Sequence, residues 1–225
     1  MTPELLAAVM EATWPAAVMR DLGPWRLRDG AGGGKRVSAT TAERAWGEAD
    51  LDAGGGLFLI REGDGALDAA LAGMGFRIVD PVLAYAARLS AFAAPARMTG
   101  FAHWPPLEIA KALWAEAGIG PARLAVMDRV TGAKTVILGR QADRVAGVAF
   151  VALHGRQAML HTLEVAPAFR RQGCGGHILR SAAHWAQDQG ADTLSLVVTE
   201  ANAAARGLYA SLGMQVVGQY HYREK

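Results

Sequence analysis

The chain has little cysteine, little net charge and no long apolar run. Its one cysteine among 225 residues, Cys174, cannot form a disulfide within the chain, so a reducing cytoplasm is the expected compartment. The 23 basic and 21 acidic residues leave a formal charge of +2, too small to predict binding to nucleic acid. The longest apolar stretch, residues 146–153, is too short to cross a membrane. We therefore expect neither a nucleic-acid nor a membrane partner.

Metal-ligand patterns are also missing. The 6 histidines, at positions 103, 154, 161, 177, 184 and 221, show no spacing typical of metal ligands, so the sequence predicts no metal site. What the chain does have is apolar residues, 52% of the total, and its length allows one large domain or two small ones.

The most informative segment runs from Val165 to Gly176. A predicted strand over residues 157–165 leads into two arginines and three glycines, and an amphipathic helix follows. Glycines let the backbone approach an anion closely, the first free N–H groups of a helix point at it, and arginines add positive charge. The segment predicts a pyrophosphate site.

Other glycine-rich loops fit this segment less well. A Walker loop needs Lys and Ser or Thr after its last glycine, whereas His177 and Ile178 follow Gly176. A dinucleotide-binding fold needs a further glycine after Gly175 and a second strand-helix-strand half downstream, for which too little chain remains. A plain turn with surface arginines stays as the structural alternative.

A second pattern follows. Residues 193–199 read as a strand, and Asn202 then caps a helix that Gly213 ends. On this helix Tyr209 shares the apolar face and so points inward. The alternative interpretation makes Tyr209 a core aromatic and Asn202 only a cap.

Both patterns resemble those of a known family. Arg170-x-x-Gly173-x-Gly175 resembles the coenzyme A loop of the GCN5-related N-acetyltransferase (GNAT) superfamily. Asn202-x-x-Ala205-x-x-x-Tyr209-x-x-x-Gly213-Met214 is similar to its second signature, with Met214 where Phe is usual. The resemblance implies an α/β (α+β) fold with a mixed, mostly antiparallel sheet flanked by helices. It covers residues 98–225 strongly, and the whole chain looks like tandem-domain members.

The resemblance implies that acetyl-coenzyme A is the cosubstrate. Backbone N–H groups around Leu163 and Val165 would face the thioester carbonyl. Asn202 and Tyr209 would meet the pantetheine arm and the sulfur. The residues expected around the diphosphate are Arg170, Arg171, Gln172, Gly173, Cys174, Gly175 and Gly176.

The implied reaction is direct transfer of an acetyl group to a primary amine in a ternary complex. Tyr209 is the expected acid for the departing thiolate, because an ordinary tyrosine with a pKa of ~10 stays protonated at neutral pH. The base stays open between His161, Glu164 and a chain of water molecules. His161 and Glu164 have opposite parity on their strand, so only one is expected to face the cleft. Cys174 is expected to be a small spacer in the loop and not a nucleophile.

The acceptor is left open between a small molecule and a peptide amine. Two other functions compete with the main one: a non-catalytic module that senses acyl-coenzyme A, and a protein N-terminal acetyltransferase resembling the ribosomal alanine type. The sequence does not fix the oligomeric state, and a homodimer is one option.

An internal repeat predicts a duplicated fold. Residues 57–79 align with residues 195–217 without a gap at an offset of 138, matching Gly75 with Gly213. Each copy reads as strand, helix, glycine stop and strand. Leu71 stands where the second copy has Tyr209, and the first half has no equivalent arginine-glycine loop. Its early glycine cluster, residues 30–35, is predicted to be a hairpin turn leading into a strand at residues 36–40.

A low-charge segment with Pro and Gly, residues 90–100, suggests a boundary. We expect a degenerate GNAT-like domain over residues 1–92 and a catalytic domain over residues 98–225. The latter should contain a helix at 106–117 and strands at 134–140, 144–153, 157–165 and 214–222. The resemblance implies one more strand after the last; either the first domain supplies it or nothing does.

Overall fold

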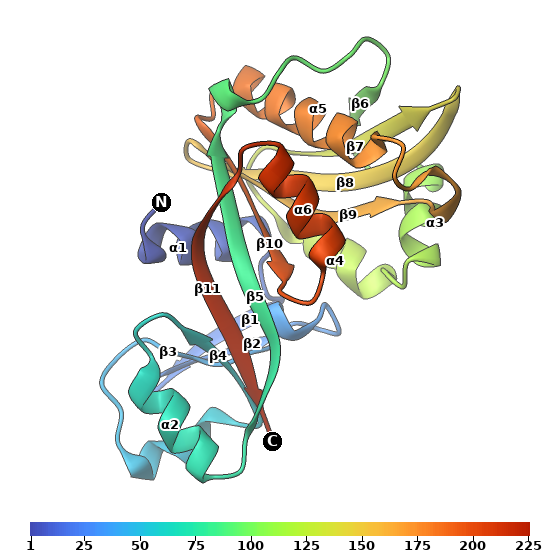
Figure 1. Ribbon diagram of the computed structural model, residues 1–225. Coiled ribbons are helices and arrows are strands. Elements are labelled where there is room, and N and C mark those ends of the chain that lie inside the picture. The colour runs from blue at the N-terminus through green and yellow to red at the C-terminus, as the bar shows by residue number, and fades with distance from the viewer.

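The computed structural model describes all residues from 1 to 225 and contains two sheets (Figure 1). A small sheet has the order β1-β2-β3, and a large one has the order β4-β11-β5-β10-β9-β8-β7-β6. All paired neighbours are antiparallel except β9 and β10, which confirms the mixed, mostly antiparallel sheet. The strands are β1 Val18–Leu22, β2 Trp25–Asp29, β3 Thr41–Ala42, β4 Leu57–Arg61, β5 Arg77–Arg88, β6 Gly100–His103, β7 Lys134–Gln141, β8 Arg144–His154, β9 Gln157–Val165, β10 Thr193–Thr199 and β11 Gln215–Glu224.

Helices cover both faces of the large sheet. Helices α5 and α6 lie on one face, and α1, α3 and α4 lie on the other (Figure 1). None of them is both long and apolar enough to span a bilayer. The α-helices are α1 Pro3–Thr13, α2 Gly65–Gly73, α3 Glu108–Glu116, α4 Pro121–Arg129, α5 Cys174–Asp188 and α6 Ala203–Ser211.

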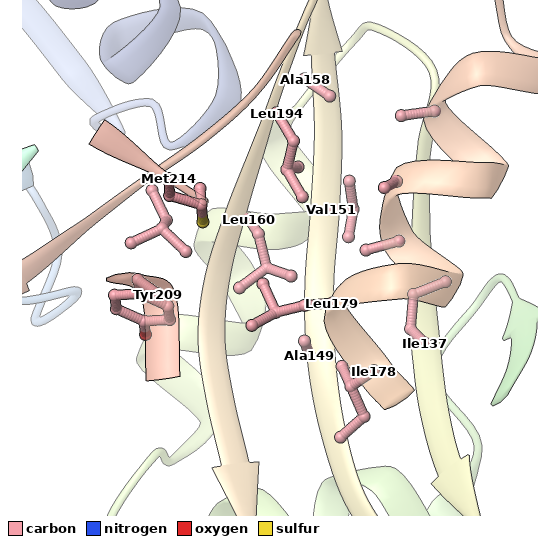
Figure 2. Packing of buried hydrophobic residues seen from close by; sticks show 14 of the residues in the cluster. Ile137, Ala149, Val151, Ala158, Leu160, Ile178, Leu179, Leu194, Tyr209 and Met214 are labelled. Carbon is pink, nitrogen blue, oxygen red and sulfur yellow. The ribbon is translucent and has the colours of Figure 1, made fainter. Parts of the chain in front are cut away.

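Helix α5 forms as its sequence pattern predicts. Its apolar stripe is buried against β7, β8 and β9, and Figure 2 shows Ile178 and Leu179 pointing at Ala149, Val151 and Leu160. The helix ends before Gly190, which adopts a left-handed φ of 82°. Packing of this stripe fixes where the first turn of α5 stands relative to the sheet. The buried members of the stripe are Ile178, Leu179, Ala182, Ala183 and Ala186.

The structure confirms most elements expected from the sequence, adds α1, β1 and β2 in the first half of the chain, and adds two elements in the second half. Strands β9 and β10 have the expected bounds, and the cap of α6 forms, with Asn202 Oδ1 accepting from Ala205 N at 3.1 Å. Strand β6 and helix α4 are additions. The signal for α4 was Pro121 directly after Gly120, since proline is favoured in the first helical turn.

The predicted strand at residues 36–40 is wrong. Residues Lys35–Val37 form a short 3-10 helix, and only Thr40 makes an isolated bridge, to Phe58. The glycine cluster before it is a loop after β2 and not a hairpin turn; the hairpin is the β1–β2 connection at Gly23–Pro24. The reason is tertiary: Val37 is buried in one cluster with Val126 of α4, so this segment turns toward α4 and leaves the sheet.

The predicted duplication is visible in the register of the central strands. Strands β5 and β11 pair with each other, β4 pairs with β11, and β10 pairs with β5. The pair Arg77–Glu224 shows the relation. Moving Arg77 forward by the repeat offset of 138 gives Gln215, and moving Glu224 back by 138 gives Ala86. Gln215 and Ala86 are also a pair. The same operation relates the β4–β11 and β5–β10 ladders. The two strand-helix-strand units are therefore arranged around a local two-fold axis between β5 and β11.

This arrangement answers what completes the sheet after the last strand. Strand β5, from the first half of the chain, inserts between β10 and β11 and pairs antiparallel with both (Figure 1). The pairs Leu196–Tyr85 and Val216–Tyr85 mark the insertion point. The large sheet is thus continuous across the segment at residues 90–100, and the second half needs β5 to close its backbone hydrogen bonds.

A polar cluster fastens α2 to the last strand. Asp68 Oδ1 accepts from Arg223 Nε and His221 Nε2, both at 2.7 Å, and Arg223 Nη1 also donates to Phe76 O at 2.9 Å. The hydrogen bond from Arg223, helped by that from His221, holds the pKa of Asp68 below its ordinary 3.8 despite burial.

Replacing Asp68 by alanine should lower the free energy of unfolding by about 2–4 kcal/mol, because Arg223 is left buried without its charged partner. The depressed pKa means that this contribution is complete above pH 3.8 and is lost as the pH falls through the lower folded-state value. Urea denaturation at pH 7 and at pH 3 measures both effects. The exposed Asp52→Ala is the control; equal stability of the two variants at pH 7 would contradict the expectation.

Candidate functional site

A cleft of about 800 Å³ opens between the first turn of α5, helix α6 and the end of β9. We call it the α5–α6 cleft. It brings together both sequence patterns, although 26 positions separate Gly176 from Asn202 in the chain. Of the predicted site residues, its wall contains Leu163, Glu164, Val165, Arg170, Arg171, Gly173, Cys174, Gly175, Gly176, Asn202 and Tyr209. His161 and Gln172 are not part of the wall.

The first turn of α5 has the geometry of an anion site. The N-cap, Gly173, has a left-handed φ of 90°, and no side chain caps the helix, so its first N–H groups have no intrahelical acceptor. A Cβ at Gly175 would lie 2.9 Å from Cδ2 of Leu208 on α6, so a larger residue here would displace the end of the Leu208 side chain. The positive end of the helix dipole therefore faces the cleft with nothing of the chain covering it.

The arginines take different positions at this turn. Arg170 Nε donates to Val165 O at 3.0 Å, which ties the loop back to the end of β9. Arg171 is exposed and has a φ of 63°, a conformation that turns the chain into the helix. Gln172 is also exposed and donates to Ala168 O at 2.9 Å, so its side chain shapes the loop.

Strands β9 and β10 diverge next to this turn. Their parallel pairing runs from Gln157–Thr193 to Leu160–Leu196 and then stops. Beyond it β9 keeps pairing with β8 on its other edge as far as Val165. The edge of β9 over residues 163–165 therefore faces the cleft without a strand partner. Leu163 and Val165, whose backbone N–H groups are expected to face a carbonyl, lie on this edge.

A bulge changes which residues of β9 share a face. Thr162 has a φ of 50°, and the β8–β9 register shifts there, with His161 opposite Phe150 and Glu164 opposite Val148. Phe150 and Val148 are two residues apart on β8, so His161 and Glu164 lie on the same face. The expected opposite parity is wrong because the bulge adds a residue. Trp114 Nε1 donates to Thr162 O at 2.9 Å and holds the bulge in place.

His161 is buried behind the bulge. Its Nδ1 lies 3.1 Å from Arg36 Nη1 and its Nε2 lies 3.0 Å from the Thr13 hydroxyl, which itself donates to Val9 O. Arg36 can only donate, so Nδ1 accepts and Nε2 carries the hydrogen. Burial first, and then the charge of Arg36, hold the pKa of His161 well below 6.5. Both ring nitrogens are engaged, which favours a structural role for this neutral histidine.

Glu164 has the surroundings of a tunable carboxylate. It is partly buried in the wall of the cleft, and burial raises its pKa above the ordinary 4.5 against the opposing effects of Arg170 and Arg123. It accepts no side-chain hydrogen bond from the protein that would fix its charge. A proton acceptor with these properties operates nearer to neutral pH than an exposed glutamate does.

Tyr209 lies at the inner end of the cleft with 5% of its surface exposed. Burial raises its pKa to about 12, so it stays protonated throughout the physiological range. Its ring packs at 5.6 Å from that of Tyr85 on the inserted strand β5. Figure 2 shows Tyr209 beneath Met214, to the left of Leu160 and Leu179. The sequence did not predict the contact with Tyr85, because 124 positions separate the two rings.

Cys174 is a buried member of the core under α5. Its side chain is 1% exposed, and burial raises the pKa of the thiol above 9.0. A protonated thiol in this position is a poor nucleophile. The structure contains no group of three His, Cys, Asp or Glu side chains able to hold a metal ion.

Comparisons with known proteins agree with this geometry. Residues 108–214 match the sequence model of a family described as the Acetyltransferase (GNAT) family, a range that contains the α5 turn, the strand opening and Tyr209. The chain is 24% identical to an uncharacterized N-acetyltransferase of Bacillus subtilis, YobR, over 99% of this chain and 97% of that protein. Residues 108–214 therefore belong to the GNAT acetyltransferase family.

Solved structures show that the GNAT fold extends over the whole chain. A GCN5-related N-acetyltransferase from Kribbella flavida superposes with a TM-score of 0.76 at 16% identity, covering 99% of this chain and 95% of that one. A tandem GNAT protein from the clavulanic acid biosynthesis pathway superposes with a TM-score of 0.59 at 13% identity, covering 96% and 86%. Both superpositions include the first half of this GNAT protein, although the sequence model of the family matches only residues 108–214.

The residues of this GNAT protein fit the coenzyme that the family implies. Gly175 leaves the start of α5 without a Cβ next to Leu208, and no side chain caps the first amides of the helix, so they are free to bind a diphosphate. The side-chain oxygen of Asn202 is used as the helix cap, which leaves its amide NH2 group for a ligand. The cleft is also within the size range of ~300–1,000 Å³ typical of small-molecule and cofactor sites.

Proposed function

We propose that this protein is an acetyl-coenzyme A-dependent N-acetyltransferase that transfers the acetyl group directly to a primary amine. The observation that carries the proposal is the position of the open α5 turn, the unpaired edge of β9 and the Tyr209 hydroxyl around one cleft. These supply an anion site, candidate hydrogen-bond donors for a carbonyl oxygen, and a proton donor.

In this proposal, the amides of residues 174–176 and the side chains of Arg170 and Arg171 hold the diphosphate. Asn202 and the wall of α6 hold the pantetheine arm, and the free edge of β9 orients the carbonyl. When bound, the coenzyme supplies an acetyl thioester. Tyr209 is the residue that donates a proton to sulfur, because its high pKa keeps the hydroxyl protonated.

Glu164 is our preferred base. Its raised pKa and its place in the cleft wall suit removal of a proton from the attacking amine, directly or through water. His161 stays a prediction, and its two occupied nitrogens argue against it. We propose a cytoplasmic location on the ground of the single cysteine. The acceptor is a small-molecule or peptide amine, and the screen below includes both classes.

We further propose a tandem arrangement of a degenerate first domain, residues 1–92, and a working second one, residues 98–225. Likeness to a tandem GNAT structure and the two-fold register of the strand-helix-strand units support it. The two would be interdependent, since β5 of the first completes the sheet of the second.

The direct test is titration calorimetry of the full chain with acetyl-coenzyme A, followed by a thiol-release assay against amines and short peptides. Binding with turnover of at least one amine supports the proposal. Binding without turnover of any amine would favour the sensor function, and no binding would reject both.

Glu164→Gln should lower turnover about 100-fold, the scale of general-base catalysis. Because only the deprotonated carboxylate accepts a proton, wild-type activity should fall as the pH drops through the raised pKa of Glu164, and the variant should lack that limb. Rates measured from pH 5 to pH 9 check this. Glu116→Gln, on the exposed side of α3, is the control, and an unchanged pH profile in Glu164→Gln would assign the base elsewhere.

A further inference from the structure

A second cavity lies on the face of the sheet opposite α5 and α6. Helix α1 covers it, and β2, β4, β11 and the Lys35–Val37 turn form its other walls, so we call it the α1 cavity. Its volume is about 380 Å³, within the size range of small-molecule sites. It has no lining residue in common with the α5–α6 cleft. Nothing in the acetyl-transfer proposal uses it.

The floor and roof of the α1 cavity are mainly apolar. Leu6 and Met10 project from α1 and Trp14 from its C-cap position, and Leu59 and Tyr220 face them from β4 and β11. All five are buried residues of the protein. A ligand that fills the cavity would therefore need an apolar body, because these walls offer few hydrogen-bonding partners.

Charged side chains stand around this apolar space, and most are already neutralised. Arg28 pairs with Glu11 at 2.7 Å, and Arg61 pairs with Glu43 at 3.2 Å. Arg26 likewise pairs with Asp21 at 3.1 Å. The remaining carboxylates of the wall, those of Glu4 and Glu62, are exposed to solvent and hydrated.

Arg36 is the exception. It lines the cavity and is only partly exposed, and no carboxylate oxygen lies within 4.0 Å of its guanidinium nitrogens. Its polar partner is the neutral ring of His161, through Nη1 at 3.1 Å. That ring is fixed by the Thr13 hydroxyl at 3.0 Å and by stacking on Trp14 at 5.0 Å. The guanidinium is therefore positioned in advance, with its charge uncompensated and most of its donors free.

We propose that the α1 cavity binds a small monocarboxylate with an apolar chain, and that the carboxylate pairs with Arg36. A guanidinium offers two parallel N–H donors that match a carboxylate, and the apolar chain would lie between α1 and β4. A polyphosphate fits less well, because the three other arginines already have carboxylate partners.

The test uses hexanoate as the probe, with hexylamine and hexanol as cationic and neutral analogues of the same length. Titration calorimetry of the full chain should give a dissociation constant for hexanoate at least tenfold lower than for either analogue. Saturation with coenzyme A should leave that constant unchanged. Equal affinity for all three, or competition between hexanoate and coenzyme A, would overturn the proposal. Failure of coenzyme A to bind would affect only the proposed function.

Two variants locate the site. Arg36→Gln should weaken hexanoate binding at least tenfold, whereas Arg20→Gln, an exposed arginine on β1 outside the cavity, should not change it. Ala7→Leu, on the cavity side of α1, should weaken binding to a similar extent by filling the space while leaving Arg36 in place. It also keeps the test decisive if Arg36→Gln does not fold. Unchanged affinity in either folded variant would overturn the proposal.

Discussion

Replacing Tyr209 by phenylalanine should lower turnover by about 100- to 1,000-fold, within the range observed for loss of a general acid. The physical reason is the leaving group: without a proton donor, the thiolate must depart as an anion inside a largely buried cleft. Burial raises the pKa of Tyr209 to about 12, which keeps that proton in place at any physiological pH. Steady-state thiol release with a saturating amine measures the effect.

Binding of the coenzyme separates this role from a structural one. The Tyr209→Phe protein should bind acetyl-coenzyme A with a dissociation constant within about threefold of the wild type, because the ring and its contact with Tyr85 remain. Tyr222→Phe removes the hydroxyl of another buried tyrosine that lies outside both cavities, and should leave turnover unchanged. If Tyr209→Phe kept wild-type turnover, the proton would have to come from water.

Replacing Gly175 by valine should weaken binding of acetyl-coenzyme A by at least about 100-fold, the scale of losing two charge-assisted hydrogen bonds. A Cβ at this position would already lie 2.9 Å from Leu208 Cδ2, so the branched side chain must either displace the Leu208 side chain, which also lines the cleft, or cover the free amides itself. Both outcomes close the anion site at the start of α5. Titration calorimetry with acetyl-coenzyme A measures the loss directly.

The matched control is another helical glycine. At Gly73, on α2, an added Cβ has nothing within 4 Å, and no residue of α2 lines the α5–α6 cleft. Gly73→Ala should keep the affinity and should raise stability by up to about 1 kcal/mol, since alanine favours the helix. Thermal denaturation of both variants shows whether Gly175→Val remains folded. A folded Gly175→Val protein with normal affinity would remove the α5 turn from the coenzyme site.

Part of the candidate site was predictable because it is encoded by short stretches of chain. The α5 turn depends on the left-handed Gly173, on the free amides that follow and on the apolar stripe that orients the helix. The cap at Asn202 and the inward face of Tyr209 are equally local. Such features are determined by residues within about two helical turns of each other in the sequence, so they can be predicted without knowing the rest of the fold.

The failures have a different origin. The parity of His161 and Glu164 was wrong because a bulge at Thr162 is held by Trp114, which lies 48 positions away. The strand expected at residue 36 became a 3-10 turn because Val37 packs with α4. In both cases a distant side chain decided a local backbone conformation, and no pattern within the segment contains that information.

Local residues were enough to predict a glycine-rich helix start, a capped helix carrying Tyr209 and a repeated strand-helix-strand unit. The exchange of strands between the repeats could be seen only in the folded chain, where β5 enters the sheet between β10 and β11 and brings Tyr85 against Tyr209. The same holds for Arg36, which meets His161 across 125 positions and is left with a free charge beside the α1 cavity. The physical reason is range: turns, caps and periodicity are fixed by neighbours in the chain, whereas strand order and side-chain partners depend on which apolar surfaces are buried together.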